Sequence, residues 1–196
     1  MEDTPELESV LAALSDGDDE RAEAALDRIP EFGEAAFTAL IQMLASPDPD
    51  QRWWAVRGLA RLPADPRLTP LFTQALQDLN EGVRWAAALA LRQRPSPQAV
   101  PELIGLLESP DSLLRSLASD ALTEIGVPSV EALLEVMSHG SQAARLEALR
   151  ALARIGDRRT IPVLFAVLEE DSALMEHWAA EGLERMGVGM NFFKPS

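Results

Sequence analysis

An internal repeat constrains the fold of this chain more than any other feature of its sequence. An alanine recurs six times, at intervals of 33, 32, 31, 30 and 31 residues: Ala22, Ala55, Ala87, Ala118, Ala148 and Ala179. After each alanine come alanine or glycine at the third position, leucine at the fourth, and proline or glycine at the eighth. Because these features coincide in every copy, we expect an array of similar units that stack on one another to bury a core.

Each unit carries the sequence signals of two helices. Seven residues before the alanine stands a residue type that favours a helix N-cap: Ser15, Asp48, Asn80, Asp111, Ser141 and Ser172. An apolar stripe precedes each cap, and in four copies it begins at a proline, which is favoured in a first helical turn. The predicted hairpins span 5–30, 38–63, 70–95, 101–126, 131–156 and 162–187. The predicted fold class is therefore all-α, with about twelve helices and no strand.

The pattern resembles a known family of helical repeats. It is clearest in AVPELIGLLESPDSLLRSLASDALTEIG (99–126) and TIPVLFAVLEEDSALMEHWAAEGLERMG (160–187). These segments resemble HEAT-like repeats of the short, phycobilisome-lyase type. The resemblance implies a right-handed α-solenoid of six hairpins that forms a single domain over residues 1–196, with a tail at 188–196. Phe192 and Phe193 in this tail are expected to cover the open core of the last repeat, and a partner-binding tail is the alternative.

An arginine stands three residues before the alanine in the four central copies: Arg52, Arg84, Arg115 and Arg145. An aligned column of this kind could bind phosphate groups. The family resemblance implies instead a structural ladder between these arginines and acidic residues near the preceding turn. The expected acid is present at Asp78 and Glu170, but Ser46, Ser109 and His139 occupy the corresponding positions elsewhere. We therefore predict a partial ladder.

Two adjacent tryptophans stand in RWWAVRGLARLP, residues 52–63. Neighbours on an α-helix point about 100° apart, so a single buried stripe does not easily take both rings. Trp54, next to the alanine, is expected at the edge of the core. Trp53 is expected to face solvent, on the side that lines the concave surface in HEAT-like solenoids, and Trp85 repeats it one unit later.

We predict a partner-binding surface around these two tryptophans, which we expect about 10 Å apart, the usual spacing of packed helices. Its residues are Trp53, Arg57, Arg61, Trp85, Leu89 and Arg92. Tryptophan and arginine are favoured anchors of protein interfaces. The alternative is that strong curvature of the array buries both rings between repeats.

Several kinds of chemistry are not expected. The chain has no cysteine, so it has no thiol nucleophile or thiolate metal site. Its two histidines, His139 and His177, cannot build the paired His-Glu site of HEAT-like deoxyhypusine hydroxylase. At the outward-facing positions of the second helices, five acids outnumber three arginines, Arg57, Arg92 and Arg150, which disfavours binding of nucleic acid. We predict no catalytic residue, no cofactor and no metal.

The net charge of −15 is concentrated near the beginning of the chain, where residues 1–34 hold twelve acids against two arginines. This acidic segment serves either as a solvated cap or as an attraction for a basic partner. No run is long and apolar enough for a membrane span, and the acidic opening is unlike a signal peptide, so we expect a cytoplasmic protein.

These observations favour a non-catalytic scaffold or adaptor that binds a protein or peptide segment on the concave face formed by the second helices. The alternative is a bilin lyase subunit or a related tetrapyrrole-binding chaperone. The repeat type suggests this alternative, since a tetrapyrrole would offer a flat π-system to the tryptophans and propionates to the arginines.

Overall fold

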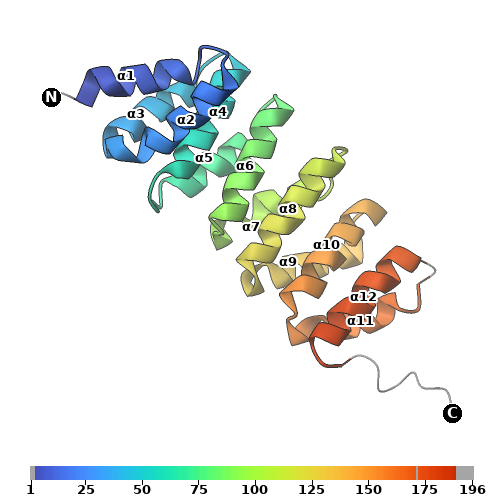
Figure 1. Cartoon of the computed structure of the whole chain (residues 1–196). Coiled ribbons are helices and arrows are strands. Elements are labelled where there is room, and N and C mark those ends of the chain that lie inside the picture. Colours follow the sequence, from blue (N-terminus) through green and yellow to red (C-terminus); the bar gives the residue numbers. More distant parts are fainter. Residues whose placement is uncertain (1–2, 171, 189–196) are drawn as a thin grey trace. The chain divides into compact units, whose positions relative to one another are not determined.

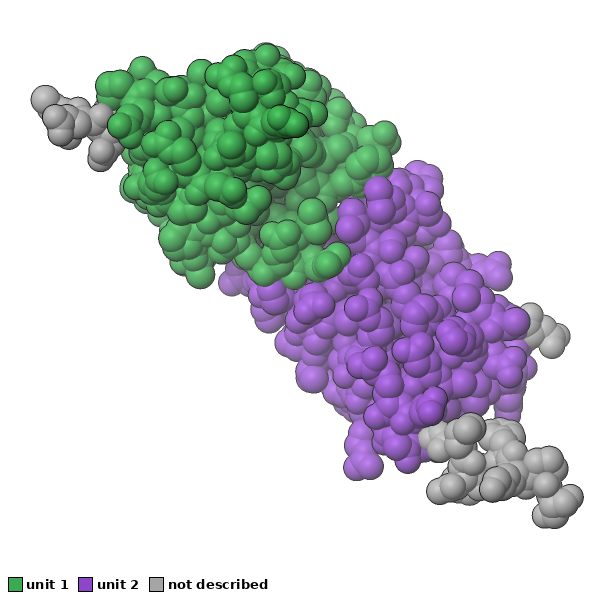
Figure 2. Space-filling view, in the orientation of Figure 1, with its two compact units in different colours: residues 1–94 green, residues 95–196 purple. Residues whose placement is uncertain are grey.

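The computed structural model describes residues 3–170 and 172–188, and the regular elements in this part of the chain are all helical (Figure 1). The all-α prediction is confirmed. Phe192 and Phe193, expected to cover the core of the last repeat, lie outside the described residues. The chain divides into two compact units, residues 1–94 and 95–196 (Figure 2). This boundary lies at the last residue of the third predicted repeat, and a single right-handed solenoid over 1–196 stays a prediction.

Unit 1, residues 1–94, contains three helical hairpins. Its elements are α1 (Asp3–Ala13), α2 (Asp19–Arg28), η1 (Ile29–Phe32), α3 (Gly33–Leu44), α4 (Pro49–Arg61), α5 (Leu68–Ala75) and α6 (Glu81–Gln93). The second helices stack in order, because α4 packs against both α2 and α6. The second hairpin begins at Gly33, earlier than the predicted residue 38, since the 3-10 turn η1 leads directly into α3.

Unit 2, residues 95–196, repeats this arrangement. Its elements are η2 (Pro97–Ala99), α7 (Val100–Leu106), α8 (Ser112–Ile125), η3 (Val127–Ser129), α9 (Val130–His139), α10 (Gln142–Ile155), η4 (Arg158–Thr160), α11 (Ile161–Val167) and α12 (Ala173–Arg185). Helix α10 packs against α8 on one side and α12 on the other. The glycines that end α8 and α10, Gly126 and Gly156, have φ of 75° and 70°, which a residue without Cβ adopts most easily.

The N-caps of the second helices lie at the predicted residues in five repeats. The first repeat differs, because Asp18 rather than Ser15 caps α2. The Asp18 carboxylate accepts hydrogen bonds from the backbone N–H groups of Glu20 and Arg21, both at 3.1 Å. Gly17, with φ of 82°, lengthens the preceding turn, so that the cap falls three residues later than the repeat pattern predicts.

The core follows the repeat pattern. The six recurring alanines are all buried, at 2% exposure or less. The small residues that follow them bring helices close together. A Cβ added at Gly182 on α12 would lie 2.9 Å from Ala153 Cα on α10. This close approach explains the glycine in this copy, and close helix packing at the equivalent positions excludes residues larger than alanine. No helix in the described residues is long and apolar enough to cross a membrane.

Candidate functional site

The six predicted surface residues lie on two neighbouring second helices of unit 1. Helix α4 carries Trp53, Arg57 and Arg61, and α6 carries Trp85, Leu89 and Arg92. Trp54 is 6% exposed, as expected for the core side of α4. Trp53 and Trp85 are half-buried, so neither of the two rings is lost inside the core. The expected separation of about 10 Å between them stays a prediction.

Trp53 owes its partial burial to contacts on its own helix and on α6. The Arg57 guanidinium carbon lies 4.5 Å from the Trp53 ring centroid and 4.9 Å from that of Trp54, within cation–π range. The two indoles meet edge to face, with centroids 4.5 Å apart. On the neighbouring helix, a Cβ at Gly82 would lie 3.7 Å from Trp53 Cδ1. The prediction of a fully solvent-facing Trp53 is therefore too simple.

Two acids from the preceding repeat form ion pairs with Arg57 and Arg61 of α4. Arg57 Nη1 lies 2.5 Å from Glu23 Oε1, and Arg61 Nη1 lies 3.1 Å from Asp27 Oδ1. Sequence reasoning missed both ion pairs. The available signal is the separation, since each pair is 34 residues apart, slightly more than one repeat. The Arg61–Asp27 pair is exposed and contributes only about 0–1 kcal/mol, whereas Arg57 is partly covered by the two indoles; a ligand carboxylate could replace the protein acid in either pair.

The surface residues on α6 are more apolar than those on α4. Leu89 is 40% exposed, Arg92 is exposed, and Trp85 is half-buried. Together with Trp53, this helix presents indole, aliphatic and guanidinium groups on one side of unit 1. Such a surface suits a ligand that combines a flat apolar body with negative groups.

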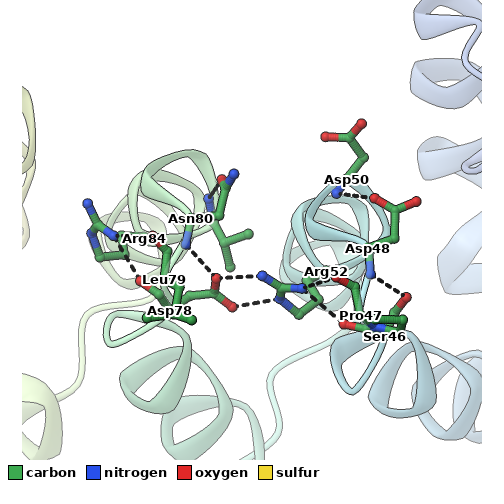
Figure 3. A network of polar contacts seen from close by, with 10 residues as sticks. Ser46, Pro47, Asp48, Asp50, Arg52, Asp78, Leu79, Asn80 and Arg84 are labelled. Carbon is green, nitrogen blue, oxygen red and sulfur yellow. Dashed lines mark hydrogen bonds and ion pairs between the residues drawn. The ribbon is translucent and has the colours of Figure 1, made fainter.

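The arginine column forms a structural ladder (Figure 3). Arg52 donates from Nε and Nη2 to the two carboxylate oxygens of Asp78, both at 2.8 Å. Its Nη1 donates to the carbonyl of Ser46 at 3.0 Å, six residues earlier. Arg84 makes the same kind of bond in the next repeat: its Nη1 donates to the carbonyl of Asp78, six residues earlier, at 2.8 Å. Asp78 thus connects two successive repeats. Its carboxylate binds Arg52 on α4, and its backbone carbonyl binds Arg84 on α6.

The ladder is partial, as predicted. In unit 2 the Arg145–Glu170 pair repeats the side-chain bond, at 2.5 Å. Arg115 donates to the carbonyl of Ser109 at 2.6 Å. The hydrogen bond from Arg52 holds the pKa of the Asp78 carboxyl below its ordinary value, against the opposing effect of burial. These contacts make the column part of the scaffold rather than a phosphate site.

In unit 2, the part of α8 and α10 that corresponds to Trp53 and Arg57 of α4 is largely polar, although Leu146 stands at the tryptophan position of α10. Arg150 donates to Ser116 Oγ at 3.1 Å, and Ser116 stands at the position that Trp53 holds on α4. Arg150 and Arg154 also share the Asp120 carboxylate, at 3.1 and 2.8 Å. Apolar and aromatic character on this helix face is thus strongest in unit 1. No three histidine or acidic side chains in the described residues are grouped so that they could hold a metal ion.

A family model described as HEAT repeats matches residues 37–123 and 130–189. This chain belongs to the HEAT-repeat family. A phycobilisome maturation protein of Synechococcus elongatus is 36% identical over 110 residues, which cover 56% of this chain and 53% of the relative. The chain therefore spans about half the length of that relative. An uncharacterised phycocyanin operon protein Z of Pseudanabaena tenuis is 31% identical over 151 residues, 72% of this chain and 74% of the relative.

Solved structures of low sequence identity share the fold. The complex of CpcE and CpcF of phycocyanin lyase from Nostoc aligns with a TM-score of 0.59 at 21% identity, over 74% of this chain and 96% of the matched chain. A designed armadillo repeat protein in complex with the peptide (KR)4 aligns with a TM-score of 0.54 at 17% identity, over 92% of this chain and 99% of that one. Both likenesses indicate a stack of helical hairpins.

Proposed function

We propose that this HEAT-repeat protein takes part in the maturation of a bilin-carrying protein, as a lyase subunit or as a chaperone that holds a linear tetrapyrrole. The relationship to the two phycobilisome and phycocyanin operon proteins carries this proposal. It favours the tetrapyrrole alternative over the general scaffold that the sequence first suggests.

The surface formed by six residues on α4 and α6, called the α4–α6 surface, has the chemistry that a linear tetrapyrrole requires. Its residues are Trp53, Arg57, Arg61, Trp85, Leu89 and Arg92. The ligand has an extended π-system that can lie against Trp53, Trp85 and Leu89. Its carboxylates can pair with Arg57 and Arg61 in place of Glu23 and Asp27. Exchanging one carboxylate for another costs little, because an exposed pair contributes about 0–1 kcal/mol.

We propose that the chain binds and presents its ligand without a catalytic group of its own. The chain contains no cysteine, and its arginine column already bonds to the helix turns. A chemical step would then depend on the partner or on the ligand.

A second candidate is a scaffold that binds a protein segment on the same helices. The solved neighbours favour it, since one pairs with a second lyase chain and another with a peptide. The two candidates differ in whether the tetrapyrrole itself is bound.

A visible-absorbance titration separates them. Purified protein is added to free biliverdin, used as the tetrapyrrole probe, and the spectrum is followed to saturation. We expect a saturable shift of the absorption band, unchanged in the Trp178→Ala control because Trp178 lies on α12 in unit 2. No spectral change, combined with binding of a phycocyanin polypeptide that lacks its chromophore, would reject the tetrapyrrole role and favour the scaffold.

A further inference from the structure

Arg57 covers an aromatic ring that the proposed tetrapyrrole site uses. It stands four residues after Trp53 on α4, so both side chains lie on the same face of the helix. The guanidinium carbon lies 4.5 Å from the Trp53 ring centroid, and Arg57 Nη1 lies 2.5 Å from Glu23 Oε1 on α2. An acid of the preceding repeat therefore holds the guanidinium over the ring.

Arg61, one turn further along α4, provides an internal comparison. It pairs with Asp27 on α2 at 3.1 Å, with the same separation of 34 residues as in the Arg57–Glu23 pair. Among the described residues of α4, Arg57 is the arginine that stacks on indole rings. Its side chain is also less exposed, at 26% against 46% for Arg61. The two arginines thus share the ion pair and differ in the ring contact.

The backward reach of this arginine recurs in unit 2, whereas the ring beneath it does not. Arg150 holds the equivalent position on α10 and donates to Ser116 Oγ on α8 at 3.1 Å. The residue four positions before Arg150 is Leu146. Pairing with the preceding repeat is therefore a feature of the scaffold. The combination of Trp53 with Arg57 is particular to α4.

A flat ligand cannot occupy the place over Trp53 that the guanidinium holds. Moving Arg57 off the ring gives up a cation–π contact and leaves a cation that requires a new partner. A carboxylate on the ligand can be that partner, because a guanidinium and a carboxylate form two parallel charge-assisted hydrogen bonds. A flat ligand without a carboxylate offers no such exchange.

We propose that Arg57 is the specificity-determining residue of the α4–α6 surface. It covers Trp53 in the free protein and leaves the ring for a flat ligand that brings its own carboxylate, which takes the guanidinium over from Glu23. The surface therefore selects tetrapyrroles with free carboxylates over their esters. This inference rests on the proposed function, and it adds that the ring is covered until such a ligand binds.

The first test compares biliverdin with biliverdin dimethyl ester by visible-absorbance titration. Wild type should bind biliverdin at least about tenfold more tightly than the ester. Arg57→Ala should bind the ester about threefold more tightly than wild type does, because the ester no longer competes with an exposed cation–π contact. Arg61→Ala is the matched control. It should weaken binding of biliverdin without any gain for the ester, since Arg61 pairs with an acid and covers no indole of α4.

A second test needs no ligand, because it measures how far acrylamide quenches the tryptophan fluorescence. It uses a Trp85→Phe/Trp178→Phe background, in which Trp53 and Trp54 remain. Trp54 is 6% exposed, so the quenching reports mainly on Trp53. Thermal unfolding establishes that each variant is folded.

In this background, Arg57→Ala should raise the quenching constant because it uncovers the ring. Glu23→Ala should raise it as well, since the acid that holds the guanidinium is gone. Asp27→Ala removes the acid that pairs with Arg61 and should leave the quenching constant at the background value.

Two results would overturn the role of Arg57 while biliverdin still binds. One is an ester affinity in Arg57→Ala no higher than in wild type, and the other is an equal quenching constant in Glu23→Ala and Asp27→Ala. Binding of neither tetrapyrrole by wild type would reject the proposed function, and selection by Arg57 with it. The two failures are distinguishable, because biliverdin binds in the first and not in the second.

Discussion

Single side chains hold α4 to the helices on either side of it. Arg57 reaches back to Glu23 on α2 while it stacks on Trp53 and Trp54. From the same helix, Arg52 reaches forward to Asp78 in the turn before α6. These contacts position the two tryptophans, because the arginine that binds the preceding repeat is also the one that covers their rings.

The Arg52–Asp78 pair should make stability depend on pH. Its hydrogen bonds lower the pKa of Asp78 in the folded state below the ordinary value of 3.8. The pair therefore stabilises the fold fully above that value, and its contribution is lost as the pH falls through the lower folded pKa. We expect Asp78→Asn to lower the free energy of unfolding by about 1.5–3 kcal/mol near neutral pH. The difference from wild type should shrink below about pH 4.

Urea unfolding at a series of pH values measures this effect. Glu81→Gln is the matched control, because Glu81 is an exposed acid in the first turn of α6. Its effect should stay within about 0.5 kcal/mol. A pH-independent loss in Asp78→Asn would show that packing of the side chain, rather than the ion pair, stabilises this turn.

The adjacent tryptophans should respond very differently to the same substitution. Trp54→Ala removes a ring that is 6% exposed and should cost about 3–5 kcal/mol of stability. Trp53→Ala removes a half-buried ring and its stack with Arg57, and should cost about 1 kcal/mol. Chemical denaturation of both variants measures the difference. Equal losses would contradict the assignment of the two rings to different sides of α4.

At the scale of helices, the repeat pattern predicted the hairpins because its signals act locally. N-cap residues, apolar stripes and terminal glycines determine where a helix begins and ends from within a few residues. The exception at Asp18 has a local cause as well, since Gly17 lengthens the turn before α2. The pairing of Glu23 with Arg57 was not predictable in this way, because it depends on how far one helix slides along its neighbour.

The small residues of the second helices offer a test of helix packing. At Gly182 on α12, a new Cβ would lie 2.9 Å from Ala153 Cα, a backbone atom that cannot easily move. At Gly58 on α4, it would lie 2.8 Å from the Cδ2 of Leu40, the end of a flexible side chain. We expect Gly182→Ala to cost about 1–3 kcal/mol. Gly58→Ala should be near neutral, because the gain in helix propensity of about 1 kcal/mol offsets a small shift of Leu40.

Thermal unfolding of the two alanine variants measures this contrast, and each serves as the control for the other. A larger loss of stability in Gly58→Ala than in Gly182→Ala would contradict the close packing of α12 on α10.

For the molecule as a whole, repetition explains why the fold was predictable and the ligand was not. Six similar hairpins define an all-α fold of the HEAT-repeat family, but proteins with this fold serve many functions. The departures from repetition carry the functional information. Tryptophan occupies a position on α4 and α6 where unit 2 has Ser116 and Leu146. The sequence indicated this surface, while the acids that neutralise its arginines became apparent only from the stacked helices.

The most direct test of the proposed function is the dissociation constant for biliverdin, measured by visible absorbance for wild type, Trp85→Ala and Asp50→Asn. Trp85 belongs to the α4–α6 surface, whereas Asp50 is an exposed acid in the first turn of α4 and is not one of the six surface residues. We expect the dissociation constant to rise at least about tenfold in Trp85→Ala, the loss typical of an interface anchor, and to stay unchanged in Asp50→Asn. A Trp85→Ala variant that is folded and binds biliverdin as tightly as wild type would contradict the proposal that the α4–α6 surface binds the tetrapyrrole.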